Sequence, residues 1–124
     1  MQAPTDIKVK SADKLMWLTF AGETHAISFE LLRVYSPSAE VKGHGGVGGE
    51  LPVGKRHVGI SKIEPVGNYA IRIFFDDGHN SGLYSWEYLY DLASKQQDYQ
   101  TEYEAQLAAQ GASREPKFIN ITNL

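Results

Sequence analysis

The sequence predicts an α+β fold, in which a mainly antiparallel β-sheet carries one short helix and one longer C-terminal helix packed on it. Two observations support this prediction. Strand-like segments occur in two groups, and a helical segment follows each group. Grouped strands favour antiparallel pairing, whereas strands that alternate with helices favour a parallel sheet. The length of 124 residues and the hydrophobic content of 42% suit one globular domain with a single core.

The first group of predicted strands leads into a short helix. The three strands cover residues 7–10, 15–20 and 24–27. The first of them alternates apolar and polar side chains, as a half-buried strand does. Ser28 stands where it can cap a helix over residues 29–34, and Glu30 lies near the positive end of that helix dipole. Pro37 ends the helical segment.

A glycine-rich loop, residues 41–54, separates the two groups. It contains the pattern G-x-G-x-x-G at residues 43–48. The dinucleotide-binding fingerprint needs a strand before this pattern and a helix after it. Pro37 precedes the loop and Pro52 closely follows the pattern, so the flanking segments do not provide these elements. We therefore expect a surface loop and not a nucleotide site.

The second group contains the strongest strand signal in the chain. Two strands cover residues 57–63 and 69–75, and a short third strand follows the tight Asp77-Gly78 turn. One face of the second strand is apolar, and we expect this face to point into the core. It consists of Tyr69, Ile71, Ile73 and Phe75.

The C-terminal part is predicted to be helical. Ser85 caps a helix whose apolar stripe should pack on the sheet, and this stripe consists of Trp86, Leu89, Tyr90 and Ala93. The same helix, or a second one after a break, continues to about Gln110, with Gly111 just beyond its end. We expect a single domain over 1–124, with a core at 6–93, a helical extension at 94–111 and a flexible tail at 112–124.

Composition argues against several classes of function. The net charge of -3 disfavours nucleic acid as a partner, because phosphate binding relies on clustered Lys and Arg. Without cysteine the chain can form no disulfide, thiolate nucleophile or Cys-ligated zinc or iron–sulfur site. No run approaches the roughly 20 apolar residues that a membrane span needs. Residues 1–6 do not resemble a signal peptide, so we expect a cytoplasmic protein, and a monomeric one.

His79 is a candidate metal ligand or general base because it lies in the sequence between carboxylates and aromatic side chains. The histidines lack the H-E-x-x-H spacing that sets two metal ligands on one element. A metal site could still be assembled if His79 converged with His44, His57 or Asp77. Asp76 and Asp77 point to opposite sides of a strand end, which disfavours a pair of carboxylates sharing a proton. No serine lies in a G-x-S-x-G motif, so a small enzyme would rest on His79 alone.

The tyrosines of the C-terminal helical region suggest a binding surface. Tyr88, Tyr99 and Tyr103 cannot all belong to the apolar stripe that begins at Trp86. Exposed tyrosines on a helix suit a protein-binding face. Together with the glycine-rich loop and a short basic cluster, they make a protein partner the expected ligand. The candidate interaction residues are His44, Lys55, Arg56, Tyr99 and Tyr103.

Several segments together resemble a known family. They comprise residues 32–41 (LRVYSPSAEV), 43–45 (GHG), 58–60 (VGI), 64–70 (EPVGNYA) and 75–89 (FDDGHNSGLYSWEYL). In them the chain resembles the gamma-butyrobetaine-hydroxylase-like N-terminal domain over about residues 6–93. This resemblance implies a small, mostly β domain that occurs alone in bacteria, in front of 2-oxoglutarate-dependent hydroxylases, or attached to P-loop carriers of iron–sulfur assembly. The catalytic iron of those hydroxylases belongs to a separate domain, so the resemblance does not imply oxygenase activity.

The resemblance also implies a metal position. In the hydroxylases the domain holds zinc through a Cys-Pro-Cys-x-x-Cys segment and the histidine of an Asp-Gly-His turn. His79 matches that histidine, whereas the three cysteine positions fall on Ser36, Ser38 and Val41. We therefore expect no cofactor, and zinc or iron bound at His79 is the alternative.

We predict from these features a non-enzymatic accessory module that binds a partner protein and is linked to iron–sulfur or metal cofactor handling. A metal-binding domain built around His79 is the first alternative. A small enzyme of unknown reaction is the second.

Overall fold

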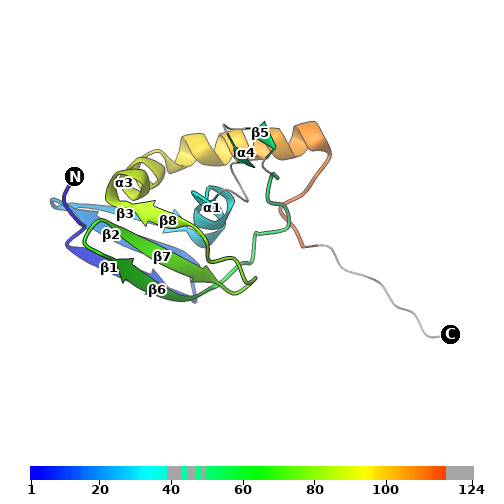
Figure 1. Cartoon of the computed structure of the whole chain (residues 1–124). Helices are drawn as coiled ribbons and strands as arrows, with labels where there is room; N and C mark the ends of the chain where they lie inside the picture. The colour runs from blue at the N-terminus through cyan, green and yellow to red at the C-terminus, as the bar shows by residue number, and fades with distance from the viewer. Residues whose placement is uncertain (39–42, 45–46, 49, 117–124) are drawn as a thin grey trace.

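Two three-stranded antiparallel sheets form the framework of the protein (Figure 1). The computed structural model describes residues 1–38, 43–44, 47–48 and 50–116. The first sheet has the order β1 (Asp6–Lys10), β2 (Leu15–Phe20), β3 (Glu23–Ser28), and the second has the order β6 (Ile60–Val66), β7 (Ala70–Phe75), β8 (Leu83–Ser85). A further short pair joins β4 (Gly43–His44) to β5 (Val47–Gly48). The strands therefore follow one another in two groups, as predicted.

Three helices are found in the described part of the chain: α1 (Phe29–Val34), α3 (Trp86–Ser94) and α4 (Gln96–Gln110). Each begins or ends at a residue that the sequence suggested. The Ser28 hydroxyl accepts a hydrogen bond from the Leu31 N–H at 3.1 Å, and the Ser85 hydroxyl accepts one from the Tyr88 N–H at 3.2 Å. Gly111 ends α4 in the left-handed conformation, with φ of 65°.

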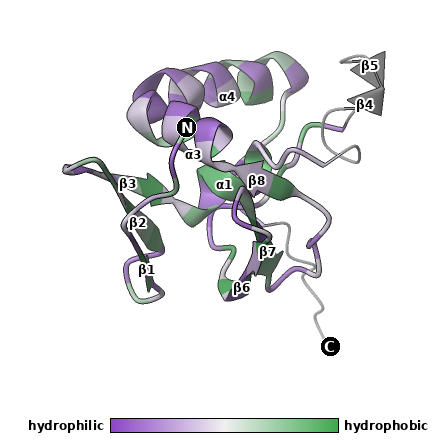
Figure 2. Ribbon diagram, turned by 60° about the vertical axis from the view of Figure 1, so that its left-hand side comes forward, coloured by the Kyte–Doolittle hydropathy of each residue, from purple (hydrophilic) through white to green (hydrophobic). Residues whose placement is uncertain are grey.

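The helices lie on one side of the two sheets in both overall views (Figures 1 and 2). This arrangement confirms the α+β class, although the strands form two three-stranded sheets and not one continuous sheet. The C-terminal helical region also breaks at Lys95, which lies between α3 and α4. None of the helices in the described ranges is both long and apolar enough to cross a membrane.

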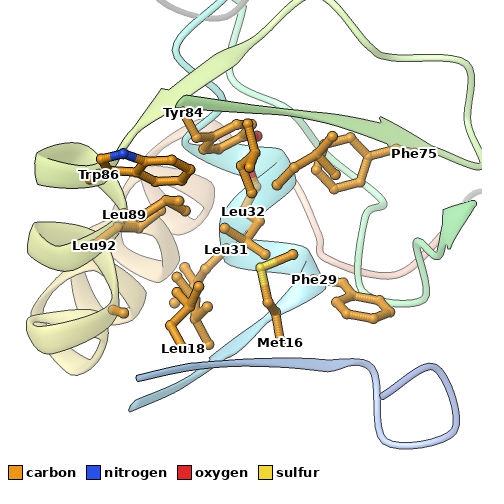
Figure 3. Packing of buried hydrophobic residues seen from close by; sticks show 14 of the residues in the cluster. Met16, Leu18, Phe29, Leu31, Leu32, Phe75, Tyr84, Trp86, Leu89 and Leu92 are labelled. Atoms are coloured by element: carbon orange, nitrogen blue, oxygen red, sulfur yellow. The ribbon is translucent and has the colours of Figure 1, made fainter. Parts of the chain in front are cut away.

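The main hydrophobic core lies between the sheets and the helices α1 and α3. Figure 3 shows Leu31 and Leu32 of α1 between side chains of the first sheet, the second sheet and α3. The fully buried side chains of this core include Met16, Leu18, Ile27, Phe29, Leu32, Ile73, Tyr84, Leu89 and Leu92. The buried Tyr84 hydroxyl donates a hydrogen bond to the Leu32 carbonyl at 2.5 Å, so its polar atom has a partner in the core. Helix α1 is therefore the element that both sheets share.

Two expectations about the second sheet need correction. Strand β6 begins at Ile60 and not at residue 57, because a turn in which the Val58 N–H bonds to the Lys55 carbonyl occupies the preceding positions. Tyr69 precedes β7, and its side chain is 57% exposed, whereas Ile71, Ile73 and Phe75 are buried. Alternation thus predicted the core face correctly only where the backbone is regular strand.

The segment that follows α4 is held against the rest of the protein, contrary to the loose tail expected from Ala112 onward. The Gly54 N–H bonds to the Ser113 carbonyl at 3.0 Å, and the Arg56 N–H bonds to the Arg114 carbonyl at 3.1 Å. Arg114 also binds the buried Glu30 carboxylate through both Nε and Nη2. These bonds extend the ordered fold to at least residue 116, and residues 117–124 lie outside the described part.

Replacing Arg114 by alanine should destabilise the fold, because Glu30 is only 4% exposed and would lose its cation. We expect the free energy of unfolding to fall by roughly 2–3 kcal/mol, less than for a fully buried pair, since 30% of the Arg114 side chain is exposed. Urea unfolding followed by circular dichroism measures this loss. The matched control is the double variant Glu30→Gln/Arg114→Ala, which should recover part of it; no recovery would contradict the pairing.

Candidate functional site

Two segments that are far apart in the sequence meet at the predicted site. One leaves α1 at residues 36–38, and the other connects β7 to β8. The Ser36 hydroxyl and His79 Nε2 are 2.8 Å apart and buried, and the Ser81 hydroxyl donates to the Ser38 hydroxyl at 2.9 Å. We call this pair of contacts, made by Ser36, Ser38, His79 and Ser81, the serine–histidine clasp.

A tight turn after β7 points His79 toward the clasp. The Gly78 N–H bonds to the Phe75 carbonyl at 3.2 Å, and the Phe75 N–H bonds to the His79 carbonyl at 3.0 Å. Gly78 has φ of 91°, a conformation that side chains rarely adopt, so glycine is needed here. Asp77 reinforces the turn, because its Oδ1 accepts from the His79 N–H at 3.1 Å. The Asp-Gly turn predicted from the sequence is therefore present, and it orients the histidine.

The clasp requires its two segments to approach closely. A Cβ atom placed on Gly82 would overlap the Ser36 hydroxyl and lie 3.1 Å from Pro37 Cδ. Gly82 therefore has a packing role in which the absence of a side chain is essential. No local sequence signal indicates this role, since it depends on a residue from the other segment.

A cluster of charges lies beside the clasp. Asp77 Oδ2 accepts from Arg33 Nε at 2.8 Å and from Lys55 Nζ at 2.7 Å. Burial raises the pKa of Asp77, but the hydrogen bonds from Lys55, the His79 N–H and Arg33 outweigh it and lower the pKa to about 2. The carboxylate thus stays charged near neutral pH, and two cations share it.

The clasp does not fit the zinc site that the family resemblance implies. Its donors are serine hydroxyls and one imidazole, whereas structural zinc is held by thiolates, imidazoles and carboxylates. The imidazole Nε2 is already bonded to Ser36. Within the described ranges no three His, Asp or Glu side chains are close enough to hold a metal ion, and Val41 lies outside those ranges.

The other proposed metal ligands do not gather at His79 in the described residues. His57 is exposed and pairs with Glu115, their Nε2 and Oε2 atoms being 3.4 Å apart. Asp77 is bonded to Arg33 and Lys55, as above. The backbone of His44 lies in β4, but its side chain is outside the described part of the structure.

The predicted interaction residues are placed differently from the expectation. Tyr103 is fully buried against Val34 and Leu107, and its hydroxyl donates to the Pro52 carbonyl at 2.6 Å. Tyr99 is half-buried, and its ring lies 4.8 Å from that of Tyr35. The expected exposure is therefore wrong for Tyr103, whereas Tyr99 keeps part of its side chain exposed. Both side chains contact residues outside α4.

The basic residues among those candidates also have intramolecular partners. Lys55 is bonded to Asp77, and Arg56 Nη1 lies 2.5 Å from Glu115 Oε1. Arg56 remains half exposed, so it is at the surface but paired.

Sequence reasoning missed an open groove at the start of β7. The groove has a volume of about 630 Å³ and is lined by Met1, Gln2, Ala3, Asn68, Tyr69, Ser85, Trp86 and Glu87. Tyr69 supplies an exposed aromatic ring, and Glu87 supplies a carboxylate. The sequence signal for this groove was the turn pair Gly67-Asn68, which places Tyr69 just before the start of β7.

Comparisons with known proteins give a consistent result. The family model described as "Gamma-butyrobetaine hydroxylase-like, N-terminal" matches residues 7–90. Two solution structures determined by NMR are similar to this chain: one is 41% identical, with a TM-score of 0.83 and coverage of 100% of this chain and 98% of the other. The second is 46% identical, with a TM-score of 0.80 and coverage of 100% and 93%.

A crystal structure of a protein of unknown function from Acidithiobacillus ferrooxidans, which belongs to the DUF971 family, is also similar. It is 36% identical, with a TM-score of 0.61 and coverage of 73% of this chain and 91% of the other. No curated protein matches the sequence.

Changes in the clasp should be energetically coupled. We expect Gly82→Ala to lower the free energy of unfolding by roughly 1–3 kcal/mol through overpacking, and Ser36→Ala by roughly 1–2 kcal/mol through loss of the bond to His79. In the Ser36→Ala background, Gly82→Ala should cost less, because the new methyl group no longer meets a hydroxyl oxygen. Urea unfolding of the four proteins measures the coupling, and strictly additive costs would argue against the close approach.

Asp77→Asn should reduce the dependence of stability on acid pH. The folded-state pKa of Asp77 lies below its ordinary value of 3.8, so the carboxylate stabilises the fold above about pH 4 and loses this contribution as the pH falls toward 2. Between about pH 5 and about pH 2.5, the wild type should lose more unfolding free energy than the variant. Denaturant unfolding at each pH provides the comparison. An identical loss of unfolding free energy in both proteins would contradict the lowered pKa of Asp77.

Proposed function

Since this chain belongs to the gamma-butyrobetaine hydroxylase-like N-terminal family, we propose that it is a non-enzymatic accessory module that binds a partner protein. The single observation that carries the proposal is the exposed ring of Tyr69 in the groove at the start of β7. Tyrosine is enriched at protein interfaces because it combines a large apolar ring with a polar hydroxyl.

The burial and pairing of the clasp residues support a non-enzymatic role. The Ser36 side chain has 0% exposure, so a substrate cannot reach its hydroxyl without local opening. His79 is 7% exposed, and the Asp77 carboxylate beside it is occupied by Arg33 and Lys55. A serine nucleophile needs an accessible hydroxyl and a base oriented by a third group. The contacts of these residues suit a structural role better.

The charge of the groove favours a basic segment of the partner. Glu87 is 78% exposed, and its carboxylate Oε1 lies 3.8 Å from the Met1 ammonium group. A lysine or arginine of a partner would compete with this ammonium group for the exposed Glu87 carboxylate. An arginine there could pair with Glu87 and stack on Tyr69. We therefore propose a partner that presents a basic side chain on an exposed segment.

The family resemblance supports a partner that handles iron–sulfur or other metal cofactors. In this proposal the partner, and not this chain, carries the metal. The donor set at His79 agrees with that division, because it lacks thiolates.

Affinity capture with tagged protein tests the proposal. The wild type should retain a specific partner that Tyr69→Ser and Glu87→Gln both lose or weaken, because they remove the aromatic ring and the carboxylate of the groove. Raising the salt concentration should weaken the remaining binding further. Mass spectrometry identifies the partner, and elemental analysis of the complex shows whether metal arrives with it.

The matched control is Val9→Ser, which removes an exposed apolar side chain from β1, away from the groove. This variant should capture the same partner as the wild type. Equal capture by wild type and both groove variants would reject the groove as the binding surface. Stoichiometric metal in the isolated chain would favour the alternative of a metal-binding domain.

A further inference from the structure

A second pocket lies beside the charge cluster, at the other end of β7 from Tyr69. Its volume is about 290 Å³, and its lining includes Arg33, Lys55, Glu50 and the apolar segment 51–53. We propose that this pocket binds a small organic monocarboxylate, with the carboxylate group held by Arg33 and Lys55. The proposal is independent of the protein-binding function, because it rests on a different pocket and different residues.

Two cations at the end of the pocket share one carboxylate. Arg33 and Lys55 share a single carboxylate, that of Asp77, and both contact the same oxygen. At this end of the pocket two cations therefore face one carboxylate, and the second negative charge of the lining is that of the exposed Glu50. Lys55 has three N–H groups and Arg33 has five, so each retains donors beyond its bond to Asp77.

One nitrogen of the Arg33 guanidinium group also lacks a hydrogen-bond acceptor. Its Nη1 atom is buried and finds no hydrogen-bond partner among the described residues. A buried donor of this kind is costly, and it calls for an explanation such as a bound ion. A ligand carboxylate would bring two oxygens to the guanidinium group, which pairs with carboxylates in a planar, bidentate geometry.

The remaining walls favour a monocarboxylate over a phosphate. Leu51, Pro52 and Val53 form an apolar side that suits a short hydrocarbon chain. Glu50 is exposed at the same pocket and contributes a negative charge. This charge disfavours a dianion more strongly than a monoanion.

A titration with sodium propionate, followed by two-dimensional NMR of the ¹⁵N-labelled protein, tests the proposal. Sodium chloride at equal ionic strength serves as the reference. We expect saturable shifts of the amide signals of Arg33, Lys55 and Val53, with a dissociation constant on the order of millimolar. Ethyl phosphate, which carries the same ethyl group on a head that is mainly dianionic at neutral pH, should bind more weakly.

Three substitutions predict three different outcomes. Lys55→Gln should weaken propionate binding by roughly tenfold, because only the Arg33–Asp77 pair would remain. Glu50→Gln should strengthen it by roughly twofold to threefold, because a repelling charge is lost. Lys62→Gln, the control, removes an exposed lysine of β6 that is paired with Glu64 and should leave binding unchanged.

Absence of saturable shifts in the wild type would overturn the proposal. So would equal binding of propionate to the wild type and Lys55→Gln, or binding of ethyl phosphate as tightly as propionate. The Glu50→Gln variant keeps the test decisive if Lys55→Gln is poorly folded, since Glu50 is exposed and its replacement should not disturb the core. None of these results bears on the proposed capture of a protein partner through Tyr69, because the two proposals rest on different pockets.

Discussion

The hydrogen bond between Ser36 and His79 is the contact on which the geometry of the site depends. It joins segments separated by 43 positions in the chain, and it does so in the interior, where an unmade bond is expensive. The bond fixes the exit of α1 against the connection between β7 and β8. Arg33 at the end of α1 and Asp77 in that connection are thereby brought within hydrogen-bond distance. Gly82 permits the approach because it has no side chain to separate the two segments.

The chemistry of the clasp explains why it can close through hydrogen bonds. Thiolates at positions 36 and 38 would repel one another and would need a cation between them. Hydroxyl groups are neutral and can donate as well as accept, so Ser38 accepts from Ser81 while Ser36 bonds to the imidazole. The donors at positions 36 and 38 are therefore hydroxyl groups, and not the thiolates of the zinc site implied by the family resemblance.

Local signals predicted the elements well, and long-range contacts account for most of what they missed. Ser28, Ser85 and Gly111 act at helix ends through bonds to near neighbours, and such bonds are visible in the sequence. Asp77-Gly78 likewise forms a turn through its own backbone. The burial of Tyr103 depends on Val34, which lies on another helix, so helical spacing alone could not reveal it. The partner of His79 was equally hidden, although the family resemblance had singled out both positions 36 and 79.

The ion pair between Glu30 and Arg114 bears on where a minimal folding unit can end. The family match ends at residue 90, and the last buried residue of the main core cluster is Ala93. A protein shortened to that limit would keep the buried Glu30 carboxylate and lose the guanidinium that neutralises it. It would also uncover Val34, against which Tyr103 and Leu107 pack. The autonomous unit of this chain therefore includes α4 and the residues after it through 116, and shorter expression fragments would be expected to aggregate or unfold.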